Sequence, residues 1–441
     1  MRPVLILCTC GTMCMAQANM PLSLKSAVEI ALAPEGSAKV ALAEESIRQA
    51  REQKTEARAS LLPDLESSVG DQRETTNLRA FGFSALQFPI PGGFSFPSIV
   101  GPFSVFDARA TVSQSVFDFS AIERYQASKT SLAAVQSDFD ATKNQVAEQV
   151  ARAYVTTLRA DAALQVAQAN VDLSQALLEL SQRQKEAGTG TGLDVVRANV
   201  QLANDKQRLV VAQNDRRRAG LNLSRAIGVD LKTEITLTGK LSFKPEDVGT
   251  LETALDEARK TRPEIKAQQS REASAKITYA SVRDERIPSV GASANYGAIG
   301  ASPANAAQTY LYGVSVKVPL FDGGRRDARR AESMSRYRQE QTRMHDLEQQ
   351  VELDVRLAYE SIQSAAAEVT TARDGVNLAQ QELDQARRRY QAGVANPLEV
   401  TDAQTRLDRA RDNQINALYD YNVARLDLAS ATGRIQEYVN Q

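Results

Sequence analysis

Two carboxylates, Glu399 and Asp402, stand three residues apart just after a Gly-Val-Ala-Asn-Pro segment at 393–397. Residues three apart lie on the same face of a helix, so the two side chains would be neighbours if a helix begins at this proline. Neighbouring carboxylates concentrate negative charge, which favours cations and repels anions. Acidic residues also stabilise a helix N-terminus through the helix dipole. The residues alone favour this helix-start interpretation.

Enzyme motifs are absent from the sequence. It contains no Gly-x-Ser-x-Gly nucleophile, no Gly-x-x-x-x-Gly-Lys phosphate loop and no histidine cluster. The single histidine, His345, lies in a long helical pattern, where we expect a surface residue. Lys and Arg total 53 against 54 Asp and Glu, so no overall basic charge attracts nucleic acid. We therefore predict a non-enzymatic protein with no cofactor, no metal and no nucleic-acid partner.

The elements that would position the two carboxylates are long helices. Within the stretch 325–390, apolar residues from Met344 to Tyr390 recur at alternating intervals of three and four apart from one extra interval of four, which is the heptad spacing of coiled coils. Gly393 and Pro397 then provide stop and start signals, and a second heptad pattern occupies 400–428. The sequence predicts an antiparallel helical hairpin over about 325–434. Its alanine-rich seam would allow close packing with neighbours on more than one side.

The chain is an internal duplication. Leu193-Asp194-Val195 matches Leu398-Glu399-Val400, and the same separation aligns Ala153-Tyr154 with Ala358-Tyr359. Similar pairs upstream extend the match toward the N-terminus. The predicted parts are a first repeat at 19–228, a connecting segment at 229–249, a second repeat at 250–434 and a C-terminal tail at 435–441.

Each repeat has the same predicted order of one helix, two strands and a helical hairpin. The opening helices are predicted at about 24–60 and 250–286. The first hairpin is predicted at about 118–228, and the two hairpin tips at 186–193 and 391–398. The four strands are predicted at about 65–79, 107–117, 289–298 and 308–320.

The last predicted strand alternates clearly, with Tyr310, Tyr312 and Val314 on one face. A length of about ten residues with an aromatic or β-branched face fits a membrane β-barrel strand, and a soluble β-hairpin is the alternative. Between the first two strands, the loop at 81–106 contains seven of the twelve phenylalanines. This loop would either cap a barrel mouth, contact a partner or pack upon the strand ends.

The N-terminus has the pattern of a signal peptide at 1–18. A basic residue and a short apolar run precede Ala16-Gln17-Ala18, a small-residue cleavage site. All three cysteines lie before this site, so the mature chain would contain none. Lipid attachment at Cys14 is the alternative. No apolar run in the rest of the chain reaches 18 residues, so we expect an exported protein without a transmembrane helix.

A constraint on assembly follows if the strands enter a membrane. Four strands cannot close a barrel, and an open sheet edge cannot face lipid because its N–H and C=O groups would be unpaired. Several copies would have to close one barrel jointly. The long helices with their alanine-rich seams would close a helical barrel in the same assembly.

The order of these elements resembles the TolC-like outer-membrane efflux proteins. The resemblance also involves Leu-Pro-Asp-Leu at 62–65, Val-Pro-Leu-Phe-Asp-Gly-Gly at 318–324 and Ala-Gly-Val-Ala-Asn-Pro-Leu-Glu-Val-Thr-Asp-Ala at 392–403. It implies a mostly α-helical homotrimer in the Gram-negative outer membrane, with a twelve-stranded barrel of four strands per chain and a periplasmic α-helical tunnel. It also implies a passive conduit for tripartite efflux or type I secretion that docks onto a periplasmic adaptor and an inner-membrane pump.

The same resemblance implies roles for residues at the tips. Glu399 and Asp402 correspond to acidic rings that narrow the pore, and Asp194 and Tyr390 to polar positions that tie the tips together. An arginine usual near the second tip is replaced by Ala395. The residues expected to contact the adaptor are Gly188, Gly190, Gly192, Leu193, Gly393, Val394, Asn396, Pro397 and Leu398. A periplasmic coiled-coil adaptor and a structural coiled-coil protein of an export complex remain the alternative functions.

Overall fold

The structure is a computed structural model that describes residues 20–81, 97–245 and 249–440. The predicted signal peptide, with its three cysteines, and most of the phenylalanine-rich loop lie outside the described residues. The chain divides into two compact units. The helical unit comprises the described residues up to Ser46 together with Gln136–Ala267 and Met344 onward, and the sheet unit comprises Ile47–Val135 and Gln268–Arg343.

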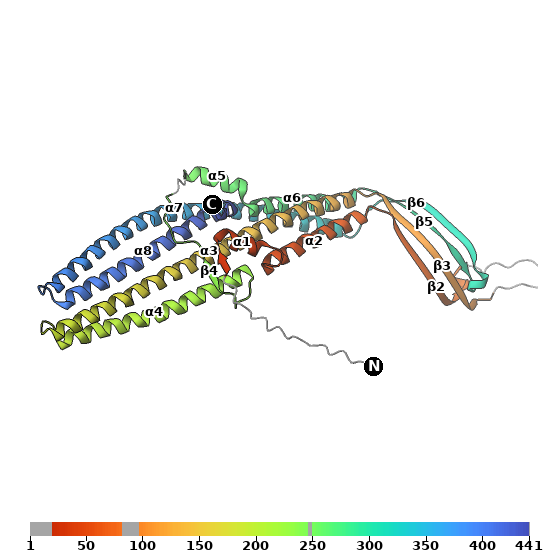
Figure 1. Cartoon of the computed structure of the whole chain (residues 1–441). Coiled ribbons are helices and arrows are strands. Elements are labelled where there is room, and N and C mark those ends of the chain that lie inside the picture. The colour runs from red at the N-terminus through yellow and green to blue at the C-terminus, as the bar shows by residue number, and fades with distance from the viewer. Residues whose placement is uncertain (1–19, 82–96, 246–248, 441) are drawn as a thin grey trace, which may run out of the picture. The chain divides into compact units, whose positions relative to one another are not determined.

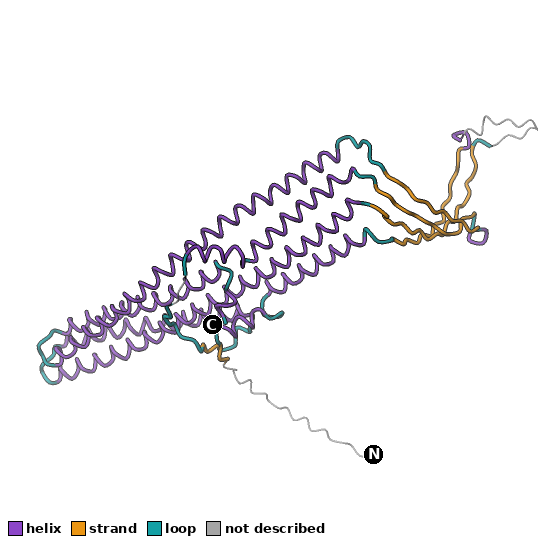
Figure 2. The backbone as a smooth tube through the Cα atoms, turned by 90° about the horizontal axis from the view of Figure 1, so that it is seen from above, coloured by secondary structure: helices purple, strands orange, loops and turns teal. Residues whose placement is uncertain are grey.

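Both predicted helical hairpins are present (Figure 1). Helices α3 (Phe119–Glu186) and α4 (Gly192–Ile227) form the first, and α7 (Arg325–Gln391) and α8 (Pro397–Ala431) form the second. In Figure 2 both helix pairs of the helical unit turn back at short loops. Ten of the heptad positions of α7 are buried: Val351, Val355, Ala358, Ile362, Ala365, Val369, Ala379, Leu383, Ala386 and Tyr390. The other four are partly buried: Met344, Leu347, Ala372 and Val376.

The prediction of one continuous helix at the start of each repeat is wrong. The first repeat opens with α1 (Leu24–Leu32) and α2 (Ala38–Ala59), separated by a turn that contains Pro34 and Gly36. A Cβ on Gly36 would lie 1.9 Å from the carbonyl oxygen of Ile30, so this tight turn requires glycine.

The second repeat opens with α5 (Leu251–Thr261) and α6 (Pro263–Arg283). Pro263 has no N–H to continue the hydrogen bonds of α5, and it disfavours a helical conformation at the residue before it. Arg262 accordingly has an extended backbone between the two helices.

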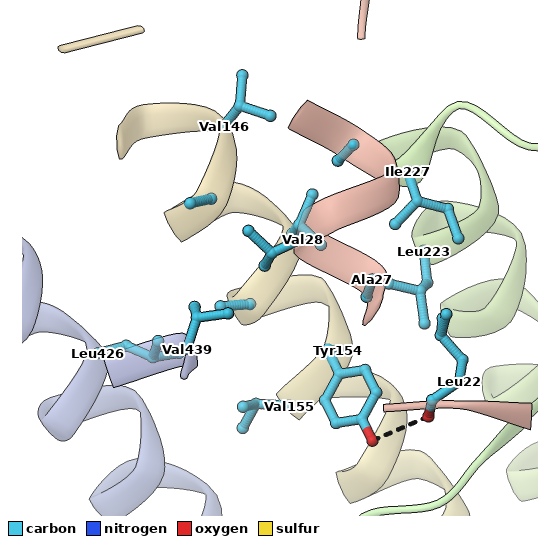
Figure 3. Close-up of a cluster of buried hydrophobic side chains, with 14 of the residues drawn as sticks. Leu22, Ala27, Val28, Val146, Tyr154, Val155, Leu223, Ile227, Leu426 and Val439 are labelled. Carbon is cyan, nitrogen blue, oxygen red and sulfur yellow. Dashed lines mark hydrogen bonds between the residues drawn. The ribbon is translucent and has the colours of Figure 1, made fainter. Parts of the chain in front are cut away.

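The connecting segment contains a strand that the sequence analysis missed. Strand β4 (Ile235–Leu237) pairs in parallel with β1 (Met20–Leu22). The buried Tyr154 of α3 joins this pair, because its hydroxyl donates to the Leu22 carbonyl at 3.2 Å and accepts from the Gly239 N–H at 3.1 Å (Figure 3). These bonds satisfy a tyrosine hydroxyl that would otherwise be buried without a partner.

The predicted C-terminal tail is not a free end. Residues Ile435–Val439 form helix α9, and the side chain of Ile435 is completely buried. Val439 of the same helix packs in the same apolar cluster as Val28 of α1 and Val146 of α3 (Figure 3). This cluster is the largest described core, and it brings together residues from both repeats.

The sheet unit has a four-stranded antiparallel sheet in the order β2-β3-β5-β6. The strands are β2 (Asp64–Asn77), β3 (Ile99–Phe117), β5 (Ser289–Gly300) and β6 (Ala307–Lys317). Strand β3 begins within the segment 81–106 that was predicted to be a loop. Within this segment, Phe103 to Phe106 pair with Glu74 to Asp71 of β2. The prolines and glycines of this region concealed the pairing, which depends on a distant strand.

The sheet exposes apolar side chains. Every residue of β6 is exposed, and Tyr310 and Tyr312 retain 73% and 78% of their accessible surface. Their rings are stacked with centroids 6.3 Å apart. Strands β2 and β6 are the two edges, and each pairs with a neighbour on one side only.

None of the described helices combines the length and apolar character that crossing a membrane requires.

Truncating Ile435 tests whether α9 belongs to the core. We expect Ile435→Ala to lower the free energy of unfolding by about 2–5 kcal/mol, because it removes a fully buried side chain from a packed cluster. Chemical denaturation of the detergent-solubilised full chain measures this change. The matched Asn440→Ala variant alters an exposed residue just beyond α9 and should change stability by less than about 1 kcal/mol. Equal stability of both variants would show that α9 does not contribute to the core.

Candidate functional site at the helical tips

The second tip is a tight turn between α7 and α8. Gly393 has a φ of +72°, a left-handed conformation that favours glycine. The N–H groups of Gly393 and Val394 donate to the Tyr390 and Arg389 carbonyls at 3.0 and 3.1 Å, which satisfies the end of α7. The Asn396 side chain then accepts the Leu398 N–H at 3.0 Å and caps α8. The glycine therefore ends α7, and α8 begins just after it, as the stop and start signals in the sequence predicted.

Glu399 and Asp402 lie in the first turns of α8. Asp402 is exposed, whereas Glu399 is partly exposed and forms an ion pair with Arg389 of α7, whose Nε is 3.4 Å from Oε1. An exposed pair of this kind contributes at most about 1 kcal/mol, so it restrains Glu399 only weakly. Both carboxylates remain accessible to ions at the tip.

At the first tip, Asp194 is bonded within its own helix start. The Thr191 hydroxyl donates to Asp194 Oδ2 at 2.7 Å, and the Thr191 N–H donates to the same oxygen at 3.0 Å. The Asp194 N–H donates in turn to the Thr191 hydroxyl at 3.3 Å. This is a capping box, which pairs backbone groups that a helix N-terminus leaves free. Asp194, expected from the family resemblance to tie the tips together, thus caps α4, a role not predicted from the sequence.

Tyr390 is buried between the two hairpins, with 6% of its surface exposed. Its carbonyl accepts a long hydrogen bond of 3.5 Å from Gln184 near the end of α3. Its hydroxyl has no hydrogen-bond partner among the described residues. Tyr390 and Asp194 line a common cavity of about 30 Å³, together with Gln404. A cavity of this size and polarity accommodates one water molecule that could bridge these groups.

The nine tip residues expected to face a partner include three exposed apolar side chains. Leu193 and Leu398 occupy matching positions at the starts of α4 and α8, and Val394 projects from the second turn. The glycines at 188 and 393 both have left-handed conformations that end a long helix. The two tips therefore present similar apolar residues from similar backbones.

A buried polar cluster that the sequence analysis missed joins the two hairpins farther along the helices. Asp205 of α4 is 1% exposed, and it accepts hydrogen bonds from Ser174 of α3 and from Gln201. Gln404 of α8 donates to the Ser174 hydroxyl at 2.7 Å. Asp408 of α8 is 4% exposed, but neither of its carboxylate oxygens has a hydrogen-bond partner among the described residues.

A signal for this cluster is present in the sequence. The buried face of α4 follows heptad spacing through Leu202, Asp205, Leu209 and Ala212, so an aspartate takes the place of an apolar residue. A charged residue at such a position is costly to bury unless it is paired. Attention to the polar members of the heptads, rather than to the apolar ones alone, would have identified Asp205.

The surroundings of Asp408 raise its pKa to about 6. Burial is the main cause and the negative charge of Asp205 the next, whereas Arg208 and Arg411 act in the opposite direction. Burial also raises the pKa of Asp412, one turn farther along α8. These acids line a cleft of about 640 Å³ between α3, α4 and α8.

Within the described residues, no group of three or more His, Cys, Asp or Glu side chains is arranged to hold a metal ion.

Comparison with protein families decides the class of this architecture. The model of the outer membrane efflux protein family matches residues 30–229 and 254–434, one match for each repeat. The chain belongs to the outer membrane efflux protein family. Duplicated hairpins with two tips and four strands are therefore the features of an outer-membrane channel protein, and the chain is a transport protein rather than an enzyme.

Individual relatives are distant but extensive. The chain is 23% identical to the alkaline protease secretion protein AprF of Pseudomonas aeruginosa, over 74% of this chain and 69% of that protein. It is 24% identical to the pyoverdine export outer membrane protein OpmQ of the same species, over 88% of this chain and 80% of the relative. These similarities include most of both repeats.

Solved structures share the fold. The outer membrane protein VceC of Vibrio cholerae aligns with a TM-score of 0.76 at 20% identity, covering 93% of this chain and 96% of VceC. The CmeC outer membrane channel of Campylobacter jejuni aligns with a TM-score of 0.80 at 15% identity, covering 95% of this chain and 88% of CmeC. The mostly helical fold with a small sheet part is confirmed.

Removing the cap of α4 tests the structure of the first tip. We expect Thr191→Ala to destabilise the first turn of α4 by about 1 kcal/mol, because the side-chain half of the capping box is lost. Hydrogen–deuterium exchange should then be about fivefold faster at the amides of residues 194–196, the first in α4 with hydrogen-bond acceptors. The exposed Lys206→Ala substitution, farther along α4, should leave exchange at this turn unchanged. If Thr191→Ala also leaves it unchanged, the capping box does not stabilise the tip.

Proposed function

We propose that three copies of this chain form one gated conduit in the Gram-negative outer membrane, with four strands from each copy in a shared twelve-stranded barrel and the long hairpins in a periplasmic helical tunnel. The observation that carries this proposal is the open four-stranded sheet. Its edges β2 and β6 are unpaired on one side, and β6 exposes Tyr310, Leu311, Tyr312 and Val314. In lipid, those apolar side chains are favourable, whereas free backbone edges are not.

Two exposed heptad faces support the same assembly. On α4, exposed residues at alternating intervals of three and four face away from the buried side of that helix: Leu193, Val196, Val200, Ala203, Gln207, Val210, Asn214, Arg217 and Leu221. On α7 a second exposed row has the same spacing: Leu353, Leu357, Glu360, Ser364, Ala367, Thr371, Asp374 and Leu378.

The two faces suit each other as partners in neighbouring copies. Exposed apolar residues at heptad spacing, such as Val196 and Val200 on α4 and Leu353 and Leu357 on α7, normally pack against another helix. The α4 row contains the basic Arg217, and the α7 row contains the acidic Glu360 and Asp374. We infer that α4 of one copy packs against α7 of the next. This contact would close the helical tunnel, as pairing of β2 with β6 between copies would close the barrel.

The gate in this proposal is the ring of second tips. Three copies of Glu399 and Asp402 would place about six carboxylates around one opening, which favours cations and repels anions. Arg389 neutralises part of this charge through its pair with Glu399. Ala395 provides no guanidinium, so the closed state would depend on Tyr390 and Asp194 across their shared cavity.

The partners proposed are a periplasmic adaptor and an inner-membrane pump. The exposed Leu193, Val394 and Leu398 would provide apolar contacts for an adaptor at both tips. The relatives are named for protease secretion and for pyoverdine export, so type I secretion and small-molecule efflux are both compatible with this architecture. Family membership favours a channel over a periplasmic adaptor or a structural coiled-coil protein.

Neutralising the tip acids tests the gate. In planar bilayers, we expect the Glu399→Ala/Asp402→Ala channel to lose its preference for cations and its block by multivalent cations, because the proposed carboxylate ring is removed. The control is Asp420→Ala, which removes an exposed acid of the same helix farther from the tip. Unchanged ion preference and block in the double variant would place these two residues outside the constriction.

Charged substitutions on the exposed heptad rows test the trimer. We expect Val200→Glu or Leu378→Glu to convert trimers to monomers in native mass spectrometry, because a carboxylate would be buried at an apolar helix contact. Val200→Leu and Leu378→Met keep an apolar side chain and should remain trimeric. A wild-type chain that is stably monomeric after detergent extraction, and that conducts no ions, would overturn the proposed assembly.

A further inference from the structure

We propose that Asp205 and Asp408 form a proton-controlled brace between the two hairpins, in which a proton on Asp408 holds α8 against α3 and α4, and loss of that proton loosens the contact. The inference concerns regulation of the tip gate and rests on the proposed channel function. It depends on three observations: where the two carboxylates lie, how differently they are bonded, and which charges surround them.

The two carboxylates come from different hairpins and share one cation. Arg208 Nη1 lies 3.6 Å from Asp205 Oδ1 and 3.5 Å from Asp408 Oδ2. Both distances are too long for good hydrogen bonds, and the Arg208 side chain is 59% exposed, so solvent screens its charge. A single screened arginine does not fully compensate two buried negative charges.

The two aspartates differ in their hydrogen bonds. Asp205 accepts from the Ser174 hydroxyl and from the Gln201 amide, whose nitrogen lies 3.2 Å from each carboxylate oxygen. These donors give both carboxylate oxygens of Asp205 hydrogen-bond partners. Asp408 has no such donor among the described residues. Asp408 is therefore the member of the pair that gains from holding a proton, and a protonated Asp408 no longer repels Asp205.

The remaining charged groups near Asp408 lie on its own helix. They are Arg411, which favours the ionised form, and Asp412, which opposes it. Arg411 also bonds to Asn170 of α3 at 3.2 Å and to Gln380 of α7 at 3.3 Å. These two partners of Arg411 are uncharged, and Gln380 donates in turn to the Asp384 carboxylate of α7 at 3.1 Å. Among the described residues, no cation from α3 or α7 acts on the pKa of Asp408, so these helices do not offset its repulsion by Asp205.

The direction of the pH effect follows from the two pKa values. In the packed hairpins the pKa of Asp408 is about 6, whereas a hydrated aspartate titrates near 3.9. The packed state binds the proton more tightly, so it is favoured as pH falls through 6, and the separated state gains as pH rises. From pH 5 to pH 7.5 the ratio of separated to packed hairpins should rise about tenfold.

The brace connects to the proposed gate through α8. Asp408 lies nine residues after Glu399 on this helix, about 13 Å along its axis. Gln404, between them, fastens α8 to Ser174 of α3, and Ser174 bonds to Asp205. A change in packing at Asp408 therefore acts on the helix that carries Glu399 and Asp402.

The test measures the distance between the hairpins directly. Nitroxide labels at the exposed positions 206 of α4 and 409 of α8 report it by pulsed electron resonance, with labelled full-length protein diluted in unlabelled protein. We expect the ratio of long to short distances to rise about tenfold from pH 5 to pH 7.5 in the wild type. Asp408→Asn should keep the acid-pH ratio throughout, and Asp420→Asn, an exposed control on α8, should behave as wild type.

A second variant keeps the test decisive if Asp408→Asn does not fold. Asp205→Asn removes the neighbouring negative charge, so the midpoint of the distance change should move to lower pH. A wild-type distance ratio that does not depend on pH, or an unshifted dependence in the aspartate variants, would overturn the brace. Conductance is recorded separately: a pH-dependent distance without ion conduction supports the brace and contradicts the channel, whereas conduction with a constant distance contradicts the brace.

Discussion

A strand at the edge of a sheet has a row of backbone N–H and C=O groups that need partners. In this chain β2 and β6 are such edges, and the side chains of β6 are apolar and exposed. Water can satisfy free edges but is unfavourable for Tyr310 and Tyr312, whereas lipid suits these aromatic rings but leaves the edges unsatisfied. Pairing β2 of one copy with β6 of another, as proposed, would meet both requirements. The proposed trimer, the barrel and the closure of the helices all depend on this constraint.

The helical unit shows how a duplicated sequence can acquire unequal roles. Both tips end a long helix with a left-handed glycine and begin the next with a side-chain cap. The first tip uses Thr191 and Asp194 for its cap, so Asp194 is engaged locally. The second tip uses Asn396, which leaves Glu399 and Asp402 available at the surface. The acids proposed to form the gate thus belong to the tip whose cap is a neutral side chain.

Polar residues in the helix interfaces give the hairpins a property that apolar seams would not have. The contact between α7 and α8 is built from residues such as Leu383 and Leu407, whose packing does not depend on pH. The contact of α8 with α3 and α4 also contains Asp205, Asp408 and the Ser174–Gln404 bond. Burying an aspartate beside another carboxylate costs stability when both are charged. A channel that has to open gains from an interface whose strength can be changed.

The amino-acid sequence by itself determined the repeats, the heptad seams of α7 and α8, both tips and the order of the strands, because these features are recorded in local periodicity and in turn residues. The tertiary structure alone decided the packing of α9, the β1–β4 pair, the early start of β3 and the placement of Asp205 and Asp408 around Arg208. Each of these joins segments far apart in the chain, and local patterns do not contain the identity of a distant partner. In the sequence, Asp408 is indistinguishable from an ordinary helix residue. Folding buries its carboxylate close to Asp205 and excludes water from it.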